Sequence, residues 1–321
     1  MYRNIMVPTD GSGFDREAIR VALRLAERSE AKVRLVRVLS QGSFFGIAAA
    51  SEGTSLAAEV VRSERDRALS ELYALAAECR ATTDVDITVD LHSGPVADVL
   101  EGYTKRHHCD LIVMSTHGRS GIARLSLGSV TDSLIRHTSV PVLVVKPAPS
   151  YLNPHVTECF KRILVPLDGS SLAEQVLPRA IAFAKLQDAE ITLLHVLQSQ
   201  AFPQRAITDR NTSWADQTIA RAEQYLNRVA AGVRGSGIPT RTDIVISESV
   251  PDAICDYAAR EHVSLIAIAT HGLGGVGRML RGSVADALIH STTASMLVWK
   301  PQLKEQIPTA LGVVEMESVS A

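Results

Sequence analysis

The chain has 321 residues, of which 46% are hydrophobic and 21% are charged, and its formal net charge is −2. This length is sufficient for two ordinary soluble domains, whereas the near-neutral charge and the 4% aromatic content argue against general binding of nucleic acid or acidic membranes. Four scattered cysteines without CxxC spacing argue against a zinc site and a disulfide framework. The N-terminus enters a strand directly, which argues against a signal peptide, and the lack of any run of ~18 apolar residues argues against a membrane span. We therefore expect a cytoplasmic protein.

In the first half of the chain, short apolar runs alternate with amphipathic segments. The first run ends in the turn 8–12, where proline and glycine stop the strand and Ser12 can cap the following helix. A loop rich in Gly, Ser and Ala spans 39–55, and loops of this length are usually functional or mobile. We expect strands at 4–7, 32–38, 86–91, 111–114 and 141–147, and helices around 18–26, 56–79, 94–106 and 130–137.

The second half repeats the first. The stretch 162–170 repeats the opening strand and its turn, so that Asp168 matches Asp10. We expect a first domain over 1–147, a linker over 148–160, a second domain over 161–301 and a loose tail over 302–321. The strands of the second half are predicted at 162–165, 190–196, 242–246, 265–269 and 295–300, and its helices at 170–186, 213–232, 250–261 and 283–290.

The most informative stretch, 115–130, follows the fourth predicted strand. Gly118 and Gly128 are separated by nine residues, and Ser129 follows the second glycine. Glycines let the backbone turn and approach a ligand closely, and the free amides at a helix start attract an anion. We therefore expect this loop to bind a phosphate. The same pattern recurs in the second half, which indicates an internal duplication, at Gly272, Gly282 and Ser283.

Strands that alternate with helices form βαβ units, so we expect an α/β fold made of two tandem repeats. Each repeat is predicted to be an open five-stranded parallel sheet with helices on both faces. In such sheets, ligands bind beyond the carboxyl ends of the strands, at the switch in strand order. The turn at 8–12 and the loop at 115–129 both follow strands, so one crevice holds both if the first and fourth strands are neighbours.

Asp10 and Asp168 end the first strand of each half. These carboxylates can accept hydrogen bonds from ribose hydroxyls, as acidic residues do in nucleotide-binding βαβ folds, or they can serve as turn residues before a helix. His117 and His271 precede the first glycine of each loop. We expect them to be structural rather than catalytic, because no partner carboxylate or nucleophile has a recognisable spacing.

The helix starts after the glycine loops also have two interpretations. Ser129 and Ser283 can cap these helices, with Asp132 and Asp286 completing a capping box, and the backbone amides can still bind phosphate. A carboxylate in the first turn opposes a triphosphate. The charges that could offset it are Arg119, Arg124, Arg278 and Arg281.

With these motifs, the chain resembles the universal stress protein family in its tandem two-domain form. The match covers both opening turns, both glycine loops and both terminal strands, which is nearly the whole chain except linker and tail. The family's ATP-binding pattern is Gly, two residues, Gly, nine residues, Gly, then Ser or Thr, and Ser115 and Ala269 replace its first glycine here. The resemblance implies a Rossmann-like fold of the adenine nucleotide alpha hydrolase type, with ATP or another adenine nucleotide in each half, which Mg²⁺ could accompany.

The resemblance also implies the residues of each nucleotide site. Those expected beside the adenine and ribose are Pro8, Asp10, Val38 and Met114 in the first half, and Pro166, Asp168, Val196 and Ile268 in the second. Those expected beside the phosphates are Gly118, Arg119, Gly128, Ser129 and Val130, and Gly272, Leu273, Gly282, Ser283 and Val284.

The resemblance further implies that the two halves pair through their fifth strands as an internal pseudo-dimer, with a homodimer of whole chains as an additional expectation. Family members act in stress tolerance, dormancy and growth regulation. We expect an ATP-binding regulator rather than a turnover enzyme, because positioning groups are present while recognisable general bases and metal-binding carboxylate pairs are not. Two alternatives stay open: a slow ATPase or relative of the ATP pyrophosphatases, and an interaction module with vestigial pockets.

Overall fold

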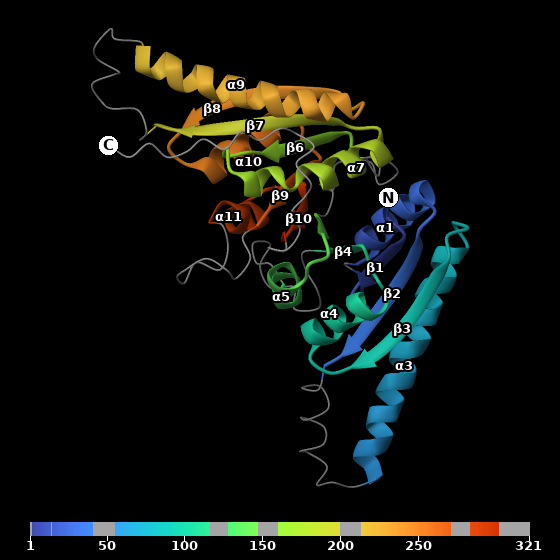
Figure 1. The fold of residues 1–321 in the computed structure, drawn as a ribbon. Coiled ribbons are helices and arrows are strands. Elements are labelled where there is room, and N and C mark those ends of the chain that lie inside the picture. Colours follow the sequence, from blue (N-terminus) through green and yellow to red (C-terminus); the bar gives the residue numbers. More distant parts are fainter. Residues whose placement is uncertain are drawn as a thin grey trace.

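The computed structural model describes residues 2–13, 15–40, 55–115, 128–146, 160–199, 213–270 and 283–301, without the side chains of 55–58, 213–214 and 283. In these ranges, strands and helices alternate along the chain (Figure 1). The elements of the first half are β1 (Asn4–Pro8), α1 (Arg16–Ser29), β2 (Lys32–Leu39), α3 (Ser55–Arg80), β3 (Ile87–Ser93), α4 (Val96–Arg106), β4 (Leu111–Ser115), α5 (Ser129–His137) and β5 (Val142–Val145). Those of the second half are β6 (Arg162–Pro166), α6 (Ser171–Glu174), α7 (Leu177–Gln187), β7 (Glu190–Gln198), α9 (Ser213–Gly235), β8 (Thr240–Ser247), α10 (Val250–Arg260), β9 (Leu265–Ala269), α11 (Ser283–Ser291) and β10 (Ser295–Trp299).

The strands form one ten-stranded sheet in the order β3-β2-β1-β4-β5-β10-β9-β6-β7-β8. Pairing within each half is parallel, and β5 meets β10 in an antiparallel pair that aligns Leu143 with Leu297. The expected α/β class and the expected pairing through the fifth strands are therefore confirmed. The first and fourth strands of each half are neighbours, β1 beside β4 and β6 beside β9, so strand order switches there as the crevice argument required.

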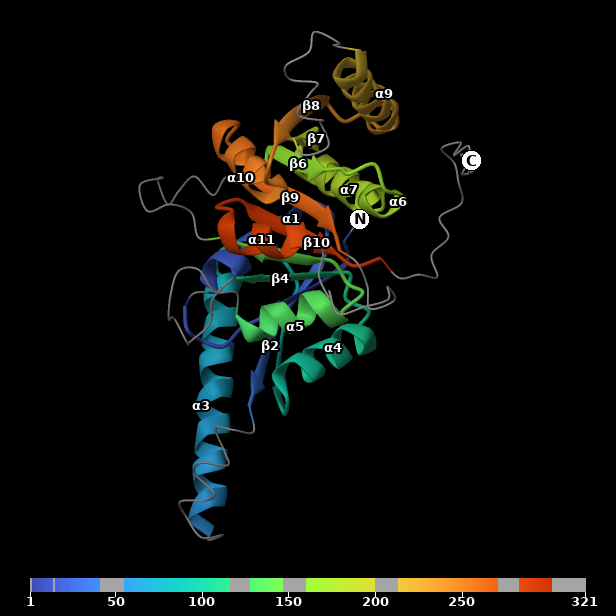
Figure 2. The same ribbon diagram turned by 90° about the vertical axis from the view of Figure 1, so that its left-hand side faces the viewer.

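Both faces of this sheet are covered by helices. Successive residues of a strand point to opposite faces, so Ile5 and Val7 enter one apolar cluster with α1, α3, α7 and α9, whereas Met6 enters the other with α4, α5, α10 and α11. Each cluster contains residues from both halves. Figure 2 shows α5 and α11 as neighbours near the middle of the molecule. The continuous apolar strands are explained by burial on both sides.

The structure corrects two predicted helices. Ser12 does not cap α1: that helix begins at Arg16 after Asp15, with no side-chain cap. The helix predicted over 170–186 is divided into α6 and α7, and Pro178 lies in the first turn of α7. Because proline lacks an amide hydrogen, it is tolerated in a first turn but would interrupt the bonding of one continuous helix.

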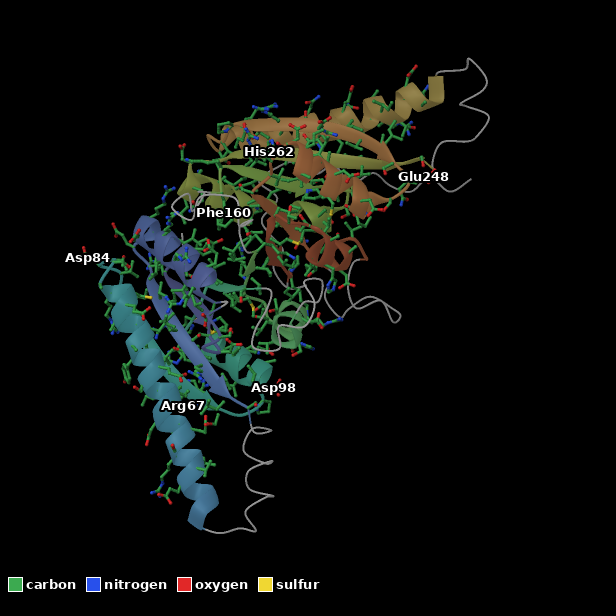
Figure 3. All side chains as sticks on the ribbon, turned by 180° about the vertical axis from the view of Figure 1, so that it is seen from behind. Arg67, Asp84, Asp98, Phe160, Glu248 and His262 are labelled. Carbon is green, nitrogen blue, oxygen red and sulfur yellow. The ribbon has the colours of Figure 1, made fainter. Side chains whose placement is uncertain are left out.

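One residue of the expected linker, Phe160, lies within the described residues. Phe160, which we expected to end the linker, is buried in the core, with its ring centroid 5.4 Å from that of Phe183. Figure 3 labels Phe160 near the junction of the two halves. Tyr2 meets the same Phe183 ring edge-on at 6.5 Å, so aromatic packing joins the halves on the α1 and α7 face. The rest of 148–160 and the tail from 302 lie outside the described residues.

Candidate functional site

The loop after β1 is held by its own backbone and side chains. Asp10 Oδ1 accepts a hydrogen bond from the Ser12 amide at 2.8 Å, and the Thr9 amide donates to the Val36 carbonyl at 2.9 Å. Gly11 has a φ of +76°, a conformation that L side chains rarely adopt. The hydrogen bond between Asp10 and the Ser12 amide supports the turn interpretation of Asp10.

Beneath this loop lies a buried polar network that the sequence interpretation missed. The Thr9 hydroxyl donates to the carboxylate of Asp15 and accepts from the Gly11 amide. Arg37 is only 4% exposed, and its Nη1 donates to Glu71 Oε2 at 2.7 Å. A Cβ atom on Gly11 would lie 3.0 Å from that same nitrogen. The sequence feature that could have indicated this network is Arg37, which lies between two valines in a strand that was otherwise expected to be buried.

The second half contains the same turn, but a different side chain lies beneath it. Asp168 Oδ1 accepts from the Ser170 amide at 2.9 Å, and Gly169 has a φ of +88°. Burial raises the pKa of Asp168, but hydrogen bonds from the Ser170 hydroxyl and amide, together with nearby His195, bring the pKa below its usual value. Asp168 is therefore ionised at neutral pH, as a carboxylate that accepts ribose hydroxyls must be.

His195 takes the position of Arg37. The β1–β2 register pairs Asn4 with Lys32, as the β6–β7 register pairs Arg162 with Glu190, so Arg37 and His195 correspond. His195 Nδ1 lies 2.7 Å from the Leu167 carbonyl oxygen, to which it donates. The two halves thus share the carboxylate turn but differ in the side chain under it, which is Arg37 in the first half and His195 in the second.

The start of α5 has open backbone amides. Its N-cap is Gly128, with no side-chain cap, and the first helical bond runs from the Asp132 amide to the Gly128 carbonyl at 2.9 Å. Ser129 is exposed and does not cap the helix, so that interpretation is wrong in the first half. Amides before Asp132 lack intrahelical partners, which is the arrangement that suits a phosphate.

The carboxylates in the first turns have local partners. Asp132 Oδ2 accepts from Arg136 Nε at 3.0 Å, four residues along α5. In α11, His290 Nε2 lies 3.7 Å from Asp286 Oδ1 at the same spacing. Arg136 thus offsets the charge of Asp132 from within the helix, a partner that the i, i+4 spacing could have indicated. The four arginines of the glycine loops lie outside the described residues.

The apolar site residues belong to the cluster on the face of the sheet that α4, α5, α10 and α11 cover. Met114 is buried in the cluster on the α4 and α5 face, and Val38 and Val130 pack against it. Ile268 holds the same place in the second half, with Val196 and Val284. Pro8 and Pro166 end β1 and β6 at this edge. The apolar residues predicted from the second strand, the fourth strand and the helix after the glycine loop therefore lie on one face of the sheet.

Some predicted residues are not placed. Gly118, Arg119, Gly272, Leu273 and Gly282 lie outside the described residues, as do His117 and His271. Ser283 is described by its backbone alone, as the first residue of α11. Within the described ranges, no three His, Cys, Asp or Glu side chains are grouped so that they could hold a metal ion, and no helix is both long and apolar enough to cross a membrane.

Comparisons with known proteins match both halves. A model described as the universal stress protein family matches residues 1–146 and 160–300. A universal stress protein of Methanocaldococcus jannaschii is 34% identical over 147 residues, 46% of this chain and 83% of the relative. One of Mycolicibacterium smegmatis is 24% identical over 303 residues, 93% of this chain and 97% of the relative. The crystal structure of a universal stress protein from Archaeoglobus fulgidus is similar in fold, with a TM-score of 0.65 at 18% identity over 92% of this chain and 98% of that chain.

Proposed function

Because this chain belongs to the universal stress protein family, we propose that each half binds one adenine nucleotide, ATP, at the carboxyl edge of its part of the sheet. We further propose that the protein acts in the cytoplasm as a regulator of stress response or growth rather than as a turnover enzyme. The observation that carries the proposal is a carboxylate turn in each half, an apolar cluster that both halves share on one face of the sheet, and the uncapped start of α5 in the first half.

Each part suits a different portion of a nucleotide. The apolar surface of Val38, Met114 and Val130 is suited to a flat adenine ring. The carboxylate of Asp10 is suited to ribose hydroxyls. The open amides at the start of α5 are suited to phosphate oxygens, because the helix dipole is positive there. These groups bind and position, which supports a binding role.

Two features of the proposal concern the metal and the domain limits. Mg²⁺ would enter with ATP and be held mainly by phosphate oxygens and water, the coordination that this ion favours. We propose domains over 1–147 and from Phe160 to 301, since Phe160 packs in the core.

The experiment is to denature the purified full chain, identify any released nucleotide by mass, and titrate the nucleotide-free protein with ATP by calorimetry. We expect an adenine nucleotide in the extract and two sites in the titration. Gly128→Glu should remove the first site, because a carboxylate would enter the phosphate position. Gly235→Glu is the matched control: Gly235 is exposed at the end of α9, and no atom lies within 4 Å of the position that a Cβ atom would take there.

An extract without nucleotide, together with no heat of ATP binding, would contradict the proposal and favour an interaction module. Steady release of phosphate from ATP that Gly128→Glu abolishes would instead favour a slow ATPase.

A further inference from the structure

Two lysines join the halves reciprocally on the α5 and α11 face. Lys146, directly after β5, donates from Nζ to the carbonyl oxygen of Ile289 in α11 at 2.7 Å. Lys300, directly after β10, donates from Nζ to the carbonyl oxygen of Arg136 in α5, also at 2.7 Å. Each lysine therefore holds a helix of the other half. We name these two bonds the lysine clasp.

The clasp uses groups that a helix leaves open. The last four carbonyls of an α-helix have no intrahelical partner, and Arg136 and Ile289 lie within the last turns of α5 and α11. An ammonium group there also meets the negative end of the helix dipole. Both bonds are partly buried, so solvent competes with them less than with an exposed contact.

The opposite ends of these helices form the proposed phosphate sites. α5 begins at Ser129 and α11 at Ser283, and each has nine residues. At a rise of about 1.5 Å per residue, each helix is a short rod. A nucleotide that orders the start of α5 therefore acts on a rod whose other end is bonded to the second half.

Each lysine is also close in the chain to its own half's site. Lys300 follows Trp299, whose carbonyl accepts a hydrogen bond from the Thr270 amide at 2.8 Å, just beyond the end of β9. Lys146 follows Val145, which pairs with Ser115 at the end of β4. The clasp thus connects the helix of one site to the strand end of the other, in both directions.

We infer that the lysine clasp couples the two nucleotide sites, so that ATP bound in one half changes the affinity of the other half for ATP. The inference rests on the proposed function, because it needs both sites to bind. It adds a regulatory property: the chain reports nucleotide concentration through two linked sites rather than two independent ones.

The test is calorimetry of the full chain with ATP. Gly128→Glu and Gly282→Glu each leave one site and give its affinity with the other empty. We expect the stepwise constants of the unsubstituted chain to differ from these by about fivefold or more. In Lys146→Met/Lys300→Met, the difference should disappear. Equal constants in the unsubstituted chain, or coupling that persists in the double variant, would overturn the inference while leaving the proposed function standing. Failure to bind ATP at either site would overturn both.

Control variants separate the clasp from general effects of the substitutions. Lys146→Arg/Lys300→Arg keeps a cationic donor and should keep the coupling. Lys105→Met removes an exposed lysine that pairs with Glu101 on α4 and should also keep it. Loss of coupling in Lys105→Met would overturn the assignment to the clasp.

A second measurement does not require the variant that lacks both lysines of the clasp to fold. In Gly128→Glu, ATP can occupy only the second site, and we expect it to change amide hydrogen exchange in the α5 segment 129–137. Adding Lys300→Met alone should abolish that change. Unchanged exchange in α5 on ATP addition, or a change that survives Lys300→Met, would contradict the inference.

Discussion

Arg37 Nη1 donates to Glu71 Oε2 at 2.7 Å, and the two side chains differ sharply in exposure, 4% for Arg37 and 45% for Glu71. The guanidinium lies under the turn that carries Asp10, whereas the carboxylate reaches it from the surface of α3. A buried guanidinium without its carboxylate is costly, because the desolvation of the charge is no longer offset.

We expect Glu71→Ala to lower the free energy of unfolding by about 2 kcal/mol, less than the loss of a partner in a fully buried pair because Glu71 is half exposed. Glu64→Ala is the matched control. Glu64 pairs with Arg67 on the outer surface of α3, where both are exposed (Arg67 is labelled in Figure 3), so its loss should cost less than about 1 kcal/mol. Urea unfolding measures both, and equal costs would contradict the role of Arg37.

Alanine substitutions of Gly11 and Gly169 distinguish the energetic cost of backbone strain from the cost of contact with Arg37. Both have positive φ, but a Cβ atom on Gly11 would lie 3.0 Å from Arg37 Nη1, whereas nothing lies within 4 Å at Gly169. We expect Gly169→Ala to cost about 1 kcal/mol from the left-handed backbone alone, and Gly11→Ala to cost more. Thermal unfolding of the two variants gives the difference. A smaller cost at Gly11 would show that the guanidinium moves away freely.

Substitution of Ser170 by alanine is predicted to lower stability, whereas the same substitution of Ser129 is not. The Ser170 hydroxyl accepts from the Ala173 amide at 3.1 Å and caps α6, so Ser170→Ala should cost about 1 kcal/mol of stability. Ser129 is exposed and caps nothing, so Ser129→Ala should leave stability unchanged within about 0.5 kcal/mol. Denaturant titrations of both proteins without nucleotide decide this; a matching loss in Ser129→Ala would indicate a cap in solution.

The lowered pKa of Asp168 predicts a pH-dependent contribution to stability. Because the folded pKa lies below the unfolded value of 3.8, the ionised carboxylate stabilises the fold at pH values above 3.8, and this stabilisation fades as the pH falls through the folded pKa. Asp168→Asn keeps an amide oxygen for the Ser170 amide but loses the charge. We expect it to be less stable than the unsubstituted chain at pH 7, and we expect this stability difference to shrink as the pH falls below 3.8. A stability difference that stays constant between pH 7 and pH 2 would contradict this explanation.

Local patterns determined much of this protein. Apolar runs predicted the inner strands of the sheet, because residues buried on both faces of a parallel strand must be apolar one after another. The edge strand β3 was predicted from its alternation of polar and apolar residues. The duplicated turn and glycine spacing indicated two equivalent halves, and the two aspartates were placed at strand ends where the structure has them. Each of these features depends on neighbours within a few residues.

Tertiary structure alone decided the partners that come from distant parts of the chain. The bond between Arg37 and Glu71 and the lysine clasp join residues that no local pattern relates. The burial of Phe160 likewise depends on Phe183. The physical reason is that periodicity records which way a side chain faces, whereas the partner of a buried charge is set by how strands and helices pack together in space.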